Sequence, residues 1–135
     1  MIFMQEVILI ISDNIALIDA IEAILTDEGY LIFNGVQENI ILYFEENLPQ
    51  LVLLDIDLKC EDGNVVYKRI KDSNLSNIPL IVFYNKLPCF TISKTDLIIE
   101  KPFDLMKFLI AVNDLVNSSY LSPGNDMPER RAGLI

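Results

Sequence analysis

Three charged side chains whose chemistry could serve phosphoryl transfer follow short apolar segments of the chain. Asp55 comes directly after the run LVLL, while Asp13 and Lys101 each lie two residues beyond such a run. Two carboxylates and one ammonium group in one cleft would suit a Mg²⁺ ion and a phosphoryl group, because the metal and the lysine neutralise the phosphoryl oxygens. One carboxylate would then act as the nucleophile and become an aspartyl phosphate.

Asp55 is the most informative of the three residues. Four apolar residues lead directly into it, and a carboxylate at that depth is costly unless it is paired. Taken alone, Asp13 is better explained as a helix N-cap, and Lys101 as an ordinary loop lysine. The prediction of a site therefore depends on the three residues together.

The segments around these residues alternate between apolar strands and amphipathic helices. Short apolar runs predict strands at 6–11, 30–33, 51–54, 79–84 and 97–99. Periodic apolar positions predict helices at 15–28, from about 36 to 47, and at 65–71 and 105–116. Ser12, Asp13 and Asn14 are all suitable N-caps for the first helix, as Asp104 is for the last.

This alternation predicts an α/β fold in which a doubly wound parallel sheet carries helices on both faces. In such sheets, ligands bind outside the carboxyl ends of the strands. Asp13, Asp55 and Lys101 all follow predicted strand ends. We therefore expect them to converge at one edge of the sheet.

Composition limits the classes of function. The chain has 135 residues, which suits one domain, and 20 acids against 10 bases give a formal charge of −10. That charge repels phosphate backbones, so direct binding of nucleic acid is not expected. Histidine is absent, so a bound metal would be a hard cation such as Mg²⁺.

No apolar run spans a bilayer and no signal-peptide pattern is present, so we expect a cytoplasmic protein without membrane contact.

Four segments resemble the successive signature blocks of response-regulator receiver domains, which serve two-component and phosphorelay signal transduction. They are VILIISDN, LVLLDIDLKCEDG, IPLIVFYN and EKPFDLMKFL, and they follow the family's order over roughly residues 6–116. The resemblance implies a flavodoxin-like sheet of five parallel strands in the order 2-1-3-4-5. We expect a receiver domain over 1–117, followed by a linker or flexible C-terminal tail over 118–135.

The resemblance also implies a role for each matching residue. Asp55 would be the phosphoacceptor and Lys101 would contact the phosphoryl group, while Asp13, Asp55 and the backbone carbonyl of Asp57 would bind Mg²⁺. The donor would be a histidine kinase or a phosphotransfer protein, and a C-terminal output domain or a separate protein would be the partner downstream. The chain would be a self-phosphorylating phosphoacceptor at most, rather than an enzyme.

Four departures from the family pattern bear on this interpretation. Ser12 stands where the family usually has an acid, so one carboxylate of the metal site is lost. Tyr84 replaces the Thr or Ser that normally ends strand four, and we expect its ring to pack over the mouth of the pocket. Ile98 occupies the aromatic switch position. The segment between Tyr84 and Lys101 is shorter than usual, so we expect the fourth helix to be short or absent.

Two other functions are consistent with the sequence. Tyr84, Ile98 and the short segment fall on the parts that couple phosphorylation to output. A degenerate receiver that acts as a phosphorylation-independent protein–protein interaction module is therefore the main alternative. Asp55 and Asp57 also resemble the aspartate pair of haloacid dehalogenase-type phosphatases, although no Thr follows the pair and there is little room for a cap domain. A flavodoxin-like fold without any functional site is less consistent with the sequence, because Asp13, Asp55 and Lys101 each follow the end of a predicted strand.

Overall fold

The computed structural model describes residues 5–35, 41, 43–44, 46–86 and 96–118. The strands are β1 (Val7–Ile11), β2 (Leu31–Asn34), β3 (Leu51–Asp55), β4 (Leu80–Tyr84) and β5 (Asp96–Glu100), and the helices are α1 (Ile15–Asp27), α3 (Gly63–Lys71), the short 3-10 helix η1 (Asn74–Asn77) and α4 (Leu105–Ser118). The strands form one parallel sheet in the order β2-β1-β3-β4-β5. The predicted doubly wound sheet and its strand order are confirmed.

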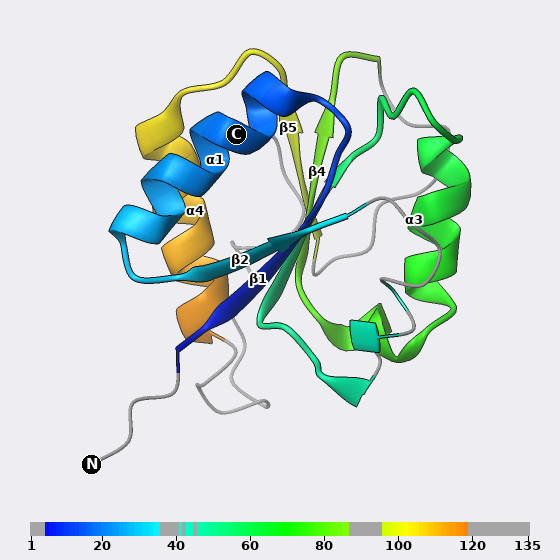
Figure 1. The fold of residues 1–135 in the computed structure, drawn as a ribbon, viewed down its shortest axis with the longest axis horizontal. Coiled ribbons are helices and arrows are strands. Elements are labelled where there is room, and N and C mark those ends of the chain that lie inside the picture. Colours follow the sequence, from blue (N-terminus) through cyan, green and yellow to red (C-terminus); the bar gives the residue numbers. More distant parts are fainter. Residues whose placement is uncertain (1–4, 36–40, 42, 45, 87–95, 119–135) are drawn as a thin grey trace.

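The strands are apolar on both sides because helices cover both faces of the sheet. Figure 1 shows α1 and α4 on one face and α3 on the other. Leu51 and Leu53 of β3 belong to the buried cluster under α1 and α4. Val52 and Leu54 belong to the cluster on the α3 side. A continuous apolar run is therefore what the central strand of such a sheet requires.

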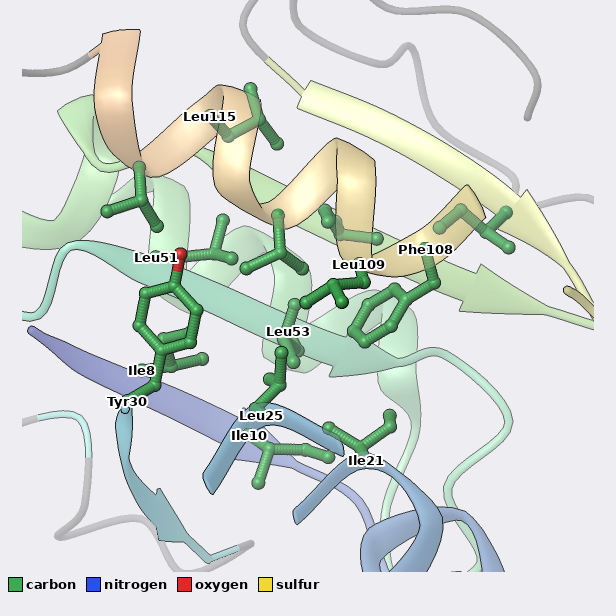
Figure 2. Packing of buried hydrophobic residues seen from close by; sticks show 14 of the residues in the cluster. Ile8, Ile10, Ile21, Leu25, Tyr30, Leu51, Leu53, Phe108, Leu109 and Leu115 are labelled. Atoms are coloured by element: carbon green, nitrogen blue, oxygen red, sulfur yellow. The ribbon is translucent and has the colours of Figure 1, made fainter. Parts of the chain in front are cut away.

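The first cluster joins the sheet to α1 and α4 (Figure 2). It includes Ile8, Ile10, Leu51 and Leu53 from the strands, Ile21 and Leu25 from α1, and Phe108, Leu109 and Leu115 from α4. Tyr30 is buried in the same cluster, and its hydroxyl bonds to Oδ1 of Asn113 on α4. These contacts fix α1 and α4 against the strands whose carboxyl ends carry the site.

Short polar side chains stand at the starts of α1, α3 and α4. Asn14 caps α1, Asp62 caps α3 and Asp104 caps α4, and each accepts a hydrogen bond from a backbone N–H of the first turn. The prediction for Asp104 is confirmed. Of the three candidates for α1, Asn14 is the cap, so the interpretation of Asp13 as an N-cap is wrong.

The start of α3 lies against the loop that follows β3. The helix begins at Gly63 rather than at residue 65 as predicted. A Cβ atom at Gly63 would overlap the backbone carbonyl of Ile56. Glycine is therefore needed for the helix to approach this loop so closely, and the pair Asp62-Gly63 provides both the cap and the contact.

Most other predicted bounds differ from the structure by one or two residues. Asp55 belongs to β3 itself, β5 begins at Asp96, and η1 was not predicted. In the second predicted helix, residues 41, 43, 44 and 46 are helical, and Ile41 and Phe44 are buried. None of the helices in the described residues is both long and apolar enough to cross a membrane.

Two predictions concern residues that the structure does not describe. The short or absent fourth helix would fall at 87–95, which lies outside the described residues. The linker or tail predicted over 118–135 lies outside them from residue 119 on, and residue 118 is the last residue of α4. The domain boundary at 117 stays a prediction for the same reason.

Candidate functional site

Asp55 ends the central strand of the sheet, between β1 and β4. Residues at the carboxyl ends of two other strands supply its partners, since Ser12 follows β1 and Lys101 follows β5. The Asp55 side chain is 1% exposed, so the apolar run of β3 carries a carboxylate into the interior as predicted. The structure brings Asp55 and Lys101 together at the carboxyl edge of the sheet.

Three donors surround the Asp55 carboxylate. Oδ1 accepts hydrogen bonds from Nζ of Lys101 at 2.8 Å and from the backbone N–H of Asp57 at 3.0 Å. Oδ2 accepts a hydrogen bond from the hydroxyl of Ser12 at 3.0 Å. The lysine charge and the two other donors offset the cost of burying this carboxylate.

Lys101 links two carboxylates. Its Nζ lies 2.8 Å from Oδ1 of Asp55 and 3.1 Å from Oδ2 of Asp57, and its side chain is largely buried. Oδ2 of Asp57 also accepts a hydrogen bond from the backbone N–H of Asn85, just after β4, at 2.7 Å. The ion pair between the side chain of Asp57 and Lys101 was not predicted from the sequence.

Asp13 binds a different part of the loop after β3. Its Oδ2 accepts hydrogen bonds from the backbone N–H groups of Lys59 at 2.8 Å and Cys60 at 3.0 Å. Burial raises the pKa of Asp13, but these hydrogen bonds outweigh it, and the pKa falls below its ordinary value of 3.8. Oδ1 of Asp13 is buried and has no hydrogen-bond partner among the described residues.

The donors at this edge can be tested against the needs of a Mg²⁺ ion. Within the described part of the chain, no three acidic, histidine or cysteine side chains gather as a metal site. Mg²⁺, however, usually binds through one or two carboxylates and keeps several water molecules. Oδ1 of Asp13 is a hard oxygen donor that accepts no hydrogen bond from the described residues, whereas both oxygens of Asp55 accept hydrogen bonds. Oδ1 of Asp13 is therefore open to a Mg²⁺ ion that keeps most of its water molecules.

Tyr84 and Ile98 occupy the two atypical switch positions. The ring of Tyr84, expected over the mouth of the pocket, is 4% exposed and belongs to the buried cluster on the α3 face. Ile98 packs against the same cluster. The backbone of Tyr84 accepts a hydrogen bond from the Lys101 N–H at 2.9 Å. The hydroxyl group that donates to Asp55 is that of Ser12, which follows β1, and not that of Tyr84 at the end of β4.

Comparisons with known proteins address the fold around this site. No family model matches the chain. The receiver domain of sensor histidine kinase PA1611 from Pseudomonas aeruginosa, solved with a magnesium ion coordinated in its active-site cleft, is 20% identical with a TM-score of 0.72, and the match covers 84% of this chain and 99% of that one. The chain has the fold of a receiver domain.

Two further solved structures share the receiver fold. A CheY-like receiver domain protein from Methanospirillum hungatei has a TM-score of 0.72 at 20% identity, and the match covers 85% of this chain and 96% of that chain. Chemotaxis protein CheY4 from Vibrio cholerae has a TM-score of 0.70 at 14% identity, and the match covers 83% of this chain and 99% of that chain.

A curated relative points to the same class of protein. Transcriptional regulatory protein DltR from Streptococcus agalactiae serotype III is 30% identical over 129 residues. The match covers 89% of this chain and 56% of DltR, so the chain spans about half the length of that relative. Together with the solved structures, this match confirms the resemblance to response-regulator receiver domains.

A second buried acid lies outside the predicted site. Asp96, the first residue of β5, is 0% exposed and lies 2.7 Å from Nζ of Lys71. It also accepts a hydrogen bond from the hydroxyl of Tyr67 at 3.2 Å. This pair was not predicted from the sequence, because ligands of parallel sheets are expected at the carboxyl ends of strands and Asp96 stands at an amino end. An acid directly before the apolar run LII was the signal available.

Proposed function

We propose that the chain is a receiver module of a phosphorelay, in which Asp55 accepts a phosphoryl group from a histidine kinase or a phosphotransfer protein. The observation that carries this proposal is the pair formed by Asp55 and Lys101, whose Oδ1 and Nζ atoms lie 2.8 Å apart at the carboxyl edge of the sheet. Such a transfer needs a nucleophilic carboxylate beside a cation that can neutralise phosphoryl oxygens. These two side chains supply both.

In this transfer, one bond to phosphorus forms and one breaks. A carboxylate oxygen of Asp55 forms a bond to phosphorus, and the P–N bond of the donor breaks, with its electron pair passing to the imidazole nitrogen. The negative charge of Asp55 is lost, and the phosphoryl group carries about two negative charges near neutral pH. Lys101, held by Asp57 at 3.1 Å, stays in place to neutralise part of that charge.

The proposal includes Mg²⁺ as a cofactor. Asp13, Asp55 and the backbone carbonyl of Asp57 would hold the ion, which when bound adds positive charge beside the phosphoryl oxygens. The buried, unpartnered Oδ1 of Asp13 supports this assignment. Because Ser12 replaces a carboxylate, we expect the affinity for Mg²⁺ to be low.

The partners follow from the same proposal. The chain would be a signalling protein rather than an enzyme that turns over a substrate, with a histidine kinase or phosphotransfer protein as its donor. An output domain on the C-terminal side, or a separate protein, would respond to it. The place of action would be the cytoplasm, without membrane contact or direct binding of nucleic acid.

A second candidate is a receiver that acts as a protein–protein interaction module without phosphorylation. The observation that favours it is the position of Tyr84, whose ring is buried in the α3-side cluster, whereas receiver domains usually have Thr or Ser at this position. A buried ring cannot move toward a phosphoryl group as a small side chain can. Under this candidate, the contacts of Asp55 serve to hold the fold.

The test is phosphorylation of the complete chain by a small-molecule donor. We would incubate the protein with acetyl phosphate and Mg²⁺ and follow its intact mass, with Asp55→Asn as the control. The proposal expects the addition of one phosphoryl group that hydroxylamine removes, since acyl phosphates react with it, and expects no addition to the control. An equal addition to both proteins would place the label elsewhere.

The negative results are equally informative. No labelling of the wild-type chain, and no binding of beryllofluoride at millimolar Mg²⁺, would refute phosphoryl acceptance and favour the interaction module. Continuous release of phosphate from phosphate esters would instead favour the phosphatase alternative.

A further inference from the structure

Ser12 directly follows β1 and is 4% exposed. Its hydroxyl donates to Oδ2 of Asp55 at 3.0 Å. The hydroxyl oxygen of Ser12 in turn accepts a hydrogen bond from the backbone N–H of Asn14 at 3.0 Å. A hydroxyl has one proton, and an ionised carboxylate can only accept. The bond from Asn14 therefore leaves the proton of Ser12 directed at Asp55.

This arrangement joins Asp55 to the start of α1. Asn14 is the N-cap of that helix, and its side chain accepts a hydrogen bond from the backbone N–H of Leu17 at 3.1 Å. The hydroxyl of Ser12 is thus held by a helix cap on one side and by the carboxylate on the other. A donor fixed at both ends orients the carboxylate more strictly than a surface side chain could.

The two oxygens of Asp55 are not equivalent. Oδ1 accepts from the Lys101 ammonium at 2.8 Å and from the Asp57 N–H at 3.0 Å. Oδ2 accepts from the neutral hydroxyl of Ser12. A charged donor withdraws more electron density than a neutral one. Oδ2 is therefore the more nucleophilic oxygen, and Ser12 determines the direction in which it points.

We propose that Ser12 is the positioning residue of Asp55, which presents Oδ2 as the oxygen that attacks phosphorus. This inference rests on the proposed function, because it assigns the geometry of the same transfer. When the bond from Oδ2 to phosphorus forms and the donor's P–N bond breaks, the negative charge leaves Oδ2 for the phosphoryl oxygens. The hydroxyl of Ser12 then has a better acceptor beside it and can follow the charge.

Ser12 would thus have a role in the site although it lacks a carboxylate. A serine at this position removes one acid from the metal site, yet it supplies a hydroxyl donor directly to the phosphoacceptor. Tyr84 ends β4 with its ring buried on the α3 side, so the hydroxyl beside the reacting oxygen comes from β1 instead of β4.

The experiment compares Ser12→Ala and Ser12→Thr with the wild-type chain. Labelling by acetyl phosphate with Mg²⁺ is followed by intact mass over a range of donor concentrations. We expect Ser12→Ala to lower the maximal labelling rate by about tenfold or more, the worth of one hydrogen bond to a charged group. The donor concentration for half-maximal rate should not change, because Ser12 acts on Asp55 and not on the donor. Ser12→Thr, which keeps the hydroxyl, should restore the rate to within about threefold.

A spectroscopic measurement and a matched control separate positioning from stability. The ¹³Cγ chemical shift of Asp55 should move in Ser12→Ala and return toward the wild-type value in Ser12→Thr, without any donor present. Ser73→Ala removes a comparable hydroxyl, which bonds to the Leu75 N–H and the Ile70 carbonyl outside the site, and should leave labelling unchanged.

The outcomes distinguish this inference from the function on which it rests. If wild-type and Ser12→Ala chains label at the same rate, the inference is wrong and the phosphoacceptor role of Asp55 stands. If both Ser12 variants are slow and neither changes the ¹³Cγ shift of Asp55, positioning is also refuted. If the wild-type chain does not label at all, the proposed function fails, and the inference fails with it.

Discussion

Two buried aspartates at opposite ends of the sheet each form an ion pair with a lysine. Asp55, at the carboxyl end of β3, is 1% exposed and lies 2.8 Å from Lys101. Asp96, at the amino end of β5, is 0% exposed and lies 2.7 Å from Lys71. Judged by burial, charge and distance alone, the two pairs are equivalent.

Their surroundings separate them. The lysine at the carboxyl end is shared with a second carboxylate, since Asp57 lies 3.1 Å from Nζ of Lys101. At the amino end, Lys71 and Tyr67 both come from α3 and both contact Asp96. In the first pair, Lys101 has a second carboxylate within reach if the charge of Asp55 changes. The second pair joins α3 to β5. The contrast teaches that a buried ion pair marks a candidate site when its cation is shared with a second carboxylate, as Lys101 is with Asp57.

The largest effect should come from breaking the pair at the amino end. Replacing Lys71 by Met should lower the free energy of unfolding by about 4 kcal/mol, because it removes a cation that lies 2.7 Å from a fully buried carboxylate. Urea denaturation measures this. Lys68→Met is the matched control on the same helix, since Lys68 pairs with Asp72 on an exposed surface, and should cost under about 1 kcal/mol. Similar losses in the two variants would contradict a structural role for Lys71.

A smaller loss of stability should follow a substitution at Gly63, where α3 lies against the loop after β3. Gly63→Ala would place a methyl group against the Ile56 carbonyl, and we expect the free energy of unfolding to fall by about 2 kcal/mol. Val65→Ala, at an exposed position on the same helix, should change it by less than about 0.5 kcal/mol. A Gly63→Ala chain as stable as the wild type would mean that the loop after β3 moves aside freely.

Neutralising each aspartate in turn tests the comparison itself. Asp96→Asn should destabilise the chain by about 1 kcal/mol more than Asp55→Asn, because Lys101 keeps its pair with Asp57 after the loss of Asp55. Paired urea denaturation curves give the difference. Phosphoryl labelling should show the opposite order, lost in Asp55→Asn and kept in Asp96→Asn. Equal stability losses would remove the distinction between the two ends.

The sequence predicted the parts of this comparison that depend on strand patterning. Continuous apolar runs identify buried parallel strands, and the rule that strand ends meet at one edge placed Asp55 with Lys101. The side chain of Asp57 and the hydroxyl of Ser12 were not predicted as partners, because their directions depend on the path of the chain after β3 and before α1. Asp96 was missed because the rule concerns carboxyl ends only.

The contacts of Asp13 also could not be predicted from the sequence. The sequence offered it as an N-cap or a metal ligand, and the structure gives its Oδ2 a third role, as the acceptor of two backbone N–H groups at Lys59 and Cys60. That contact is invisible in the sequence because it depends on where the loop after β3 passes. It leaves Oδ1 as the atom on which the metal assignment depends.

The smallest predicted effect concerns the pH dependence of this contact. The pKa of Asp13 in the folded chain is lowered from its ordinary value of 3.8. Ionised Asp13 therefore stabilises the fold above pH 3.8, and this contribution is lost as the pH falls through the lower folded value. We expect Asp13→Asn to reduce the free energy of unfolding by less than about 1 kcal/mol at neutral pH, since the contact is partly solvated. With EDTA present to remove metal ions, the difference from the wild type should disappear in strong acid. A difference that stays constant over the whole range would mean that shape, and not charge, holds Asp13 to the loop.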